Sequence, residues 1–216
     1  MVQKQFKDRA LNTWNSLVKP WGFIVGVREI NLTYPFFYLK SGLGMQFVPW
    51  QNIADWHCKA CGYCCKLYSV VLGFPEWLRI SKTFGLETTV AGLDRFYIKR
   101  AGDGSCAFLC SNINSYFCGL QGMKPEACKL WPFKVLSEPK YGEPNQAAFD
   151  YMGNKLYIYA DTMCSGLRYG TPTWGFHYTT IREFAELALG VRQVQYKTTR
   201  AVTFGQNQWE RQLRFP

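Results

Sequence analysis

The chain has 216 residues, of which 48% are hydrophobic and 17% aromatic, and these values exclude a disordered protein. No apolar run approaches the roughly 20 residues that a bilayer-spanning helix requires, and residues 1–14 lack the apolar segment of a secretory signal. We therefore expect a folded protein with no transmembrane segment, located in the cytoplasm. The formal charge of +10 is compatible with nucleic acid, an acidic protein surface or an anionic membrane as partner, and it selects none of them.

Residues 1–50 precede the cysteines and show two patterns. Apolar residues recur at helical spacing up to Leu17, which predicts an amphipathic helix that packs on its own domain. The alternative is a basic helix that lies on a membrane or a partner. Residues 21–27, 31–39 and 45–48 are aromatic and β-branched, and they predict two or three short strands.

The segment after the first cysteines predicts further short elements. We expect residues 66–72 to be extended and residues 74–84 to form a helix, because Pro75 suits its first turn and Gly85 its end. A second helix is predicted over residues 90–99, before a turn at Gly102-Asp103-Gly104. Residues 105–133 are expected to be rich in loops, with one or two helical turns at residues 125–130.

The C-terminal part predicts a hairpin and a helix. Residues 147–151 and 156–160 flank Gly153-Asn154, which is a strong hairpin signal. The capping box Thr180-Ile-Arg-Glu183 predicts a helix through Leu189, with Gly190 as its stop. A basic, aromatic tail follows, with a short strand expected at residues 201–204.

These elements together predict the fold class. We expect a small, irregular, cysteine-rich α+β fold with short antiparallel strands and three to four helices. Residues 51–170 are predicted to form the cysteine-cluster metal-binding domain. Residues 1–50 and a C-terminal helix with its basic tail, residues 171–216, are expected to pack on it.

Four cysteines occur within eight residues, in the run Cys58-Lys-Ala-Cys61-Gly-Tyr-Cys64-Cys65. Two successive two-residue spacers allow one turning loop to direct several sulfurs to one point, and both Zn²⁺ and iron–sulfur clusters favour such ligands. Gly62 fits this interpretation because a loop that folds over a metal often needs a positive φ. Cys64 and Cys65 are expected to point to opposite sides of an extended backbone.

The chain has nine cysteines, an odd number that does not suit a disulfide scaffold, so we interpret the cluster as metal ligands in a reducing compartment. The spacing of Cys58, Cys61 and Cys64 matches the first three cysteines of a bacterial ferredoxin run, but the fourth is missing. Zinc and iron–sulfur chemistry both stay open at this point. His57, next to Cys58, is an alternative ligand, but a surface or hydrogen-bonding role is expected for it. Cys110 is expected to be a small buried hydrophobe.

Four motifs follow one another between residues 58 and 170. They are Cys58-x-x-Cys61-Gly-x-Cys64-Cys65, Gly104-Ser-Cys106-Ala-Phe108-Leu109, Cys118 with Lys124-Pro125-x-x-Cys128-Lys129-x-Trp131-Pro132-Phe133, and Cys164-Ser-Gly166. In this order they resemble the YkgJ-type cysteine-cluster family, which is described as zinc- or iron-chelating. Lys124 stands where that family usually has Arg, and Ser165 where it has Pro.

The resemblance implies eight metal-ligating thiols, which would form two four-ligand sites or one cluster with a supporting set. They are Cys58, Cys61, Cys64, Cys65, Cys106, Cys118, Cys128 and Cys164. The family includes the cysteine domain of flagellin lysine N-methylase, which is associated with an iron–sulfur cluster. A [4Fe–4S] cluster is therefore favoured over Zn²⁺ as the cofactor.

Three functions remain in competition. The first is a metal-binding module that serves within an assembly, or in electron or methyl-group chemistry, with a protein as its partner. The second is a lysine N-methylase-like enzyme, for which the sequence shows neither a nucleotide loop nor catalytic residues. The third is a nucleic-acid-binding protein with structural zinc, whose tail residues Trp209, Arg211, Arg214 and Phe215 suit phosphate contacts and base stacking.

Overall fold

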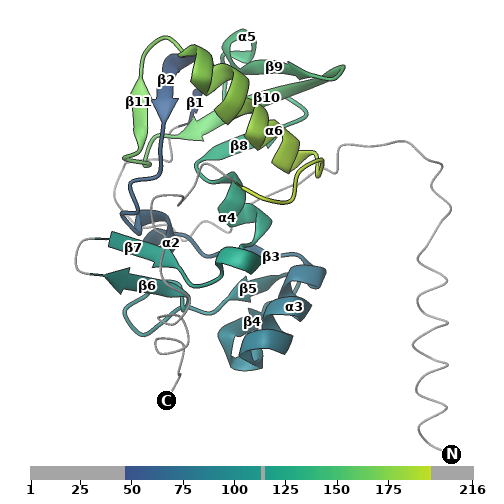
Figure 1. Ribbon diagram of the computed structural model, residues 1–216. Helices are drawn as coiled ribbons and strands as arrows, with labels where there is room; N and C mark the ends of the chain where they lie inside the picture. The colour runs from purple at the N-terminus through teal and green to yellow at the C-terminus, as the bar shows by residue number, and fades with distance from the viewer. Residues whose placement is uncertain (1–46, 113–114, 196–216) are drawn as a thin grey trace, which may run out of the picture.

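The computed structural model describes residues 47–112 and 115–195 (Figure 1). The helix predicted over residues 1–17 and the strands predicted at residues 21–27, 31–39 and 201–204 lie outside the described residues. Within the described ranges, no helix is long and apolar enough to cross a membrane.

The described residues combine short strands with short helices, so the predicted α+β class is confirmed. The strands are β1 (Phe47–Pro49), β2 (Ile53–Trp56), β3 (Val71–Leu72), β4 (Thr89–Ala91), β5 (Phe96–Ile98), β6 (Leu109–Asn112), β7 (Ser115–Cys118), β8 (Phe133–Leu136), β9 (Ala148–Tyr151), β10 (Asn154–Asp161) and β11 (Leu167–Tyr169). The α-helices are α2 (Tyr63–Leu67), α3 (Phe74–Phe84), α4 (Glu126–Leu130), α5 (Pro144–Ala147) and α6 (Arg182–Ala188). Single 3-10 turns are η1 (Trp50–Asn52), η2 (Leu86–Thr88) and η3 (Gln121–Met123), and η4 (Phe176–Ile181) is a π-helical turn.

One half of the molecule is built on the longest strand, β10, which pairs antiparallel with β1, β8 and β9 (Figure 1). Its residues from Ile158 to Asp161 are buried without alternation, as expected for a strand covered on both faces. Helix α6 packs on this sheet through Phe184, whose ring centroid lies 4.6 Å from that of Phe133 and 5.3 Å from that of Trp56. We call this packed set of side chains the first core; it also includes Ile53, Leu156, Phe176 and Ile181.

The other half is built on the three-stranded sheet β3-β5-β4 and helix α3. Leu72, Ile80, Ile98, Phe108 and Leu120 form its centre, which we call the second core. The hairpin β6-β7 extends this half, and α4 lies between the two halves in Figure 1. The described part of the chain therefore has two hydrophobic centres.

The helix predicted over residues 90–99 is wrong, because this segment forms β4 and β5 joined by a turn. The N–H of Gly92 donates to the carbonyl of Arg95 at 2.7 Å and closes the turn. Val90 then pairs with Tyr97, and Thr89 with Ile98. β-branched and aromatic side chains suit this paired, half-buried surface better than a helix.

The capping box predicted at Thr180 is also wrong, because the helix begins earlier. The turn η4 runs directly into α6, so Thr180 is a buried interior residue. The hydroxyl of Thr173 accepts a hydrogen bond from the N–H of Phe176 at 3.2 Å and caps this end instead. The predicted stop is confirmed, since Gly190 has a φ of 71°.

Other sequence predictions are confirmed. Helix α3 ends at Gly85, whose φ is 92°, and Pro75 lies in its first turn. The predicted hairpin is β9-β10, in which Asn154 pairs with Tyr151 across the turn. The helical turns predicted at residues 125–130 form α4. The extended segment predicted at residues 66–72 is only partly so, because α2 continues to Leu67.

Candidate metal centre

The opening cysteine loop is shaped by Gly62, which has a φ of 69° as the sequence predicted. A Cβ at this position would lie 2.7 Å from Cγ of Tyr116, so the loop also needs glycine for lack of space. The N–H of Tyr116 donates to the carbonyl of Ala60 at 2.8 Å. Strand β7 therefore fixes the loop from one side.

Cys64 and Cys65 do not lie in extended backbone, and that prediction is wrong. The left-handed turn at Gly62 starts helix α2, in which the N–H of Lys66 donates to the carbonyl of Gly62 at 3.0 Å. Because successive helical residues are separated by less than a third of a turn, the two sulfurs lie 3.9 Å apart on one side. Both residues line the same cavity.

That cavity has a volume of about 110 Å³ and is lined by all eight cysteines that the family resemblance implied. They are Cys58, Cys61, Cys64, Cys65, Cys106, Cys118, Cys128 and Cys164. All nine cysteines of the chain are free, and none is joined in a disulfide. The ninth, Cys110, does not line the cavity and is half-buried rather than buried as predicted.

Distant segments reach the cavity through backbone hydrogen bonds. The N–H of Cys106 donates to the carbonyl of Cys65 at 2.8 Å, and Cys118 pairs with Leu109 in the β6-β7 hairpin. The N–H of His57 donates to the carbonyl of Gly166 at 3.3 Å, which joins the opening loop to the closing loop. A Cβ on Gly166 would collide with the carbonyl oxygen of His57, so this contact requires glycine.

The thiols are gathered but are not yet arranged as ligands. Among the described residues, no group of three or more Cys, His, Asp or Glu side chains is placed to hold a metal ion. A cysteine sulfur moves between staggered positions when χ1 rotates, while the backbone stays in place. The structure therefore supplies a soft donor set around one cavity.

Burial dominates the electrostatics of most of these thiols. It raises the pKa of Cys106 to about 11 and raises the pKa of Cys128 well above its ordinary value. Cys64 is the exception, because a hydrogen bond with Cys65 lowers the pKa of Cys64 and raises that of its partner. The nearby charge of Lys124 also lowers the pKa of Cys64.

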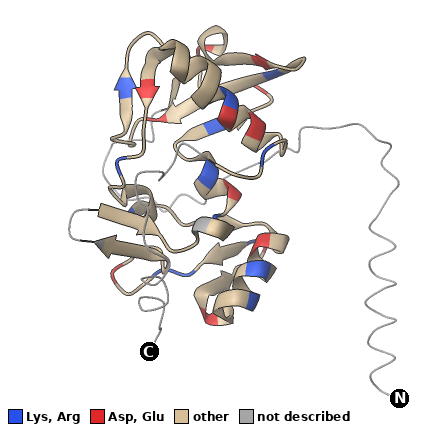
Figure 2. Cartoon of the chain, viewed as in Figure 1, with Lys and Arg blue, Asp and Glu red and all other residues tan. Residues whose placement is uncertain are grey.

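Lys124 is a functional candidate that the spacing of cysteines did not reveal. It lines the cavity together with Lys59, and its charge favours the thiolate forms of Cys58, Cys64, Cys118 and Cys128. Elsewhere in the described residues, Lys and Arg are interleaved with Asp and Glu over both halves (Figure 2). The sequence signalled this residue only as the Lys of the motif Lys124-Pro125.

The indole N–H of Trp56 indicates whether the cavity suits thiolates. Its indole Nε1 is buried and has no nitrogen or oxygen acceptor in the structure. It lies beside Cys164, where burial raises the pKa and the indole N–H opposes that rise. A thiolate at Cys164, bound to a metal, would accept this hydrogen bond and satisfy a donor that is otherwise unpaired. The residues present therefore fit a thiolate-bound metal.

A family model described as "CxxCxxCC: Putative zinc- or iron-chelating domain" matches residues 57–165. The chain belongs to this family. The resemblance seen in the cysteine motifs is thereby confirmed, and chelation of zinc or iron is the chemistry that the family description supports. Comparisons with curated proteins and with solved structures found no match.

Proposed function

We propose that the cavity thiols of this protein bind a metal centre, and that a [4Fe–4S] cluster is favoured over Zn²⁺. The protein would serve as a metal-binding module within a larger assembly, in electron or methyl-group chemistry. One observation carries this proposal: eight of nine cysteines, drawn from four distant segments, line one cavity and remain unpaired. Such a gathering of unpaired thiols around one cavity is typical of a thiolate metal site.

The character of the lining supports a cluster. None of the described residues that line the cavity is Asp, Glu or His, so the donors available are sulfurs alone. A [4Fe–4S] cluster with four thiolates carries net negative charge, and Lys59 and Lys124 provide opposite charge in the wall. His57 is exposed and does not line the cavity, which agrees with the surface role expected for it.

The same lining supports a binding module rather than a hydrolytic site. General acid–base chemistry most often uses imidazole or carboxylate groups, and none of the described residues that line the cavity carries either. Cys58 and Cys61 are exposed, so a bound centre would reach the protein surface. A partner protein could therefore approach the centre closely enough to exchange electrons or metal.

The test is metal analysis of anaerobically purified protein. Iron and acid-labile sulfide in equal amounts, brown colour and an electron paramagnetic resonance signal after reduction would support the cluster. Stoichiometric zinc in colourless protein would show that the bound metal is Zn²⁺ and not a cluster. Protein without either metal would contradict the proposal. Cys61→Ser and Cys64→Ser are expected to lose metal, whereas Cys110→Ser, outside the cavity, is expected to keep it.

A further inference from the structure

The thiol cavity lies between the two cores and takes its wall from both. Trp56 belongs to the first core, and Ile98 and Cys106 belong to the second. Helix α4 and the residues before it add Lys124 and Cys128 to the wall. Because Lys124 carries charge into this wall, the contacts that hold its side chain affect any centre bound there.

Helix α4 is held at its start by a side chain of α3. Glu76, in the first turn of α3, accepts a hydrogen bond from the N–H of Glu126 at 2.8 Å. Within α4, the N–H groups of Cys128 and Lys129 both donate to the carbonyl of Pro125, at 3.0 and 2.9 Å. The backbone that carries Cys128 is therefore fixed from the second half of the molecule.

After α6 the chain turns back toward α4, and we call residues 190–195 the strap (Figure 1). The strap is anchored on α6, because Nη2 of Arg192 lies 2.6 Å from Oε2 of Glu186 and the N–H of Arg192 donates to the carbonyl of Glu186 at 3.1 Å. It also contacts α4, where the ammonium of Lys129 donates to the carbonyl of Gln193 at 2.9 Å. The strap therefore joins α6 to α4.

Gln195, in the strap, connects the backbone of α4 to the side chain of Lys124. Its carboxamide Nε2 donates to the carbonyl of Lys129 at 2.6 Å, and its Oε1 accepts a hydrogen bond from the ammonium of Lys124 at 3.4 Å. A lysine ammonium stands on a flexible four-carbon stem, so its own backbone does not fix its position. The carboxamide of Gln195 is itself fixed by α4, and it can therefore hold the ammonium at the cavity wall.

We propose that Gln195 is a positioning residue for Lys124, and that the strap thereby sets how tightly the thiol cavity binds metal. This inference rests on the proposed function, in that the cavity thiols bind metal. Four thiolates around a divalent ion carry net negative charge, and the attraction of that charge to an ammonium weakens as their separation grows. The strap lies outside residues 57–165, which the family model matches, so this control belongs to the rest of the chain.

The test measures the affinity of the reduced full chain for Co²⁺ in competition with a chelator. Gln195→Ala is expected to lower this affinity by roughly threefold, the change that one hydrogen bond of ordinary strength produces. Gln195→Met keeps the length of the side chain and removes its polar atoms, so it should give the same loss even if the alanine variant does not fold. Gln193→Ala is the matched control, because the side chain of Gln193 contacts the carbonyl of Gly190 and not Lys124.

A double-mutant cycle separates the positioning of Lys124 from a general effect on the structure. Lys124→Met removes the ammonium, and Gln195→Ala should then cause no further loss of affinity for Co²⁺. An equal loss with and without Lys124, an equal loss in Gln193→Ala, or no loss in either Gln195 variant would show that the positioning role is wrong although metal binding stands. If wild type binds no Co²⁺, Zn²⁺ or iron, the proposed function fails, and this inference fails with it.

Discussion

The backbone N–H of Cys106 donates a 2.8 Å hydrogen bond to the carbonyl oxygen of Cys65. This bond joins two cysteine segments that are far apart in the sequence, and it requires no metal. The contacts of Tyr116 with Ala60 and of His57 with Gly166 act in the same way on the other segments. Backbone hydrogen bonds therefore hold the cysteine segments around the cavity without using a thiol sulfur.

Gly62→Ala is expected to destabilise the protein more than Gly153→Ala. Both positions have positive φ, 69° and 79°, so the backbone strain is similar, at roughly 1–3 kcal/mol. Only at position 62 does the new Cβ meet a neighbour, Tyr116, at 2.7 Å, whereas nothing lies within 4 Å at position 153. Urea unfolding of both variants measures the difference, and equal losses of unfolding free energy would show that Tyr116 does not restrict the loop.

Gly166→Ala is expected to lower metal retention. The added Cβ collides with the carbonyl oxygen of His57, so the closing loop must move away from the opening loop. Gly175→Ala is the matched control, because nothing lies within 4 Å of its new Cβ and its φ is −61°. Metal content after gel filtration should fall in the first variant only. Unchanged content in Gly166→Ala would mean that Cys164 is not needed for retention.

Lys124→Gln is expected to weaken metal binding by roughly tenfold, or about 1.4 kcal/mol. Its ammonium favours the thiolate forms of four cavity cysteines, and thiolates rather than thiols bind metal. Without this charge the thiol pKa values rise, so the loss of affinity should shrink as pH increases. Lys124→Arg keeps the charge and should restore affinity. Chelator competition at several pH values measures this, and a loss independent of pH would contradict an electrostatic role.

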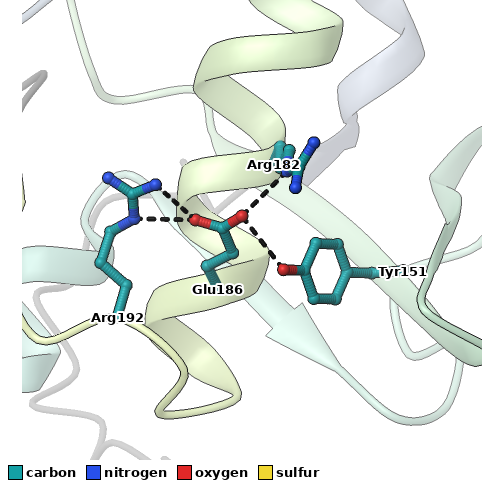
Figure 3. A network of polar contacts seen from close by, with 4 residues as sticks. All are labelled: Tyr151, Arg182, Glu186 and Arg192. Carbon is teal, nitrogen blue, oxygen red and sulfur yellow. Dashed lines mark hydrogen bonds and ion pairs between the residues drawn. The ribbon is translucent and has the colours of Figure 1, made fainter.

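Glu186→Gln is expected to destabilise the fold by about 1–3 kcal/mol at neutral pH. Figure 3 shows the Glu186 carboxylate between Arg182, Arg192 and Tyr151, at 2.9, 2.6 and 3.0 Å. Desolvation by burial raises the pKa of Glu186, but the bonds from these three partners outweigh it and lower that pKa. Because the folded pKa lies below the unfolded value, the carboxylate contributes stability above the unfolded pKa and loses it as pH falls through the folded pKa.

The difference in melting temperature between wild type and Glu186→Gln should therefore narrow as pH falls below the ordinary glutamate pKa of 4.5. Glu138→Gln, at an exposed position, is the control and should change little at any pH. A constant difference across this pH range would show that the charge of Glu186 does not stabilise the fold.

Proline and glycine residues at the ends of elements predicted several helices and turns correctly. Pro75 and Gly85 bound α3, and the glycine turn between β9 and β10 formed as expected, because these residues restrict φ and ψ without help from distant parts of the chain. Residues 90–99 were misjudged because pairing of β5 with β3 and β4 decides their conformation. Such pairing is a tertiary effect that periodicity in one segment does not reveal.

The sequence predicted which cysteines line the candidate site but not how they are arranged in space. The motifs named eight cysteines, whereas the helical turn at Cys64 and Cys65 depends on the left-handed Gly62 and on Tyr116. The positions of Lys124 and Trp56 depend on how the two halves meet. The lysine N-methylase-like and nucleic-acid-binding hypotheses stay predictions, and the tail residues that motivated the latter lie beyond residue 195.

The position of the cavity between the first and second cores has a thermodynamic consequence. An ion bound by sulfurs from both sides would make the two cores melt as one cooperative unit, since neither could open without breaking metal–sulfur bonds. Calorimetry of the loaded protein should then give a single transition, and the chelated protein two. Metal occupancy would thus decide whether the molecule behaves as one body or as two.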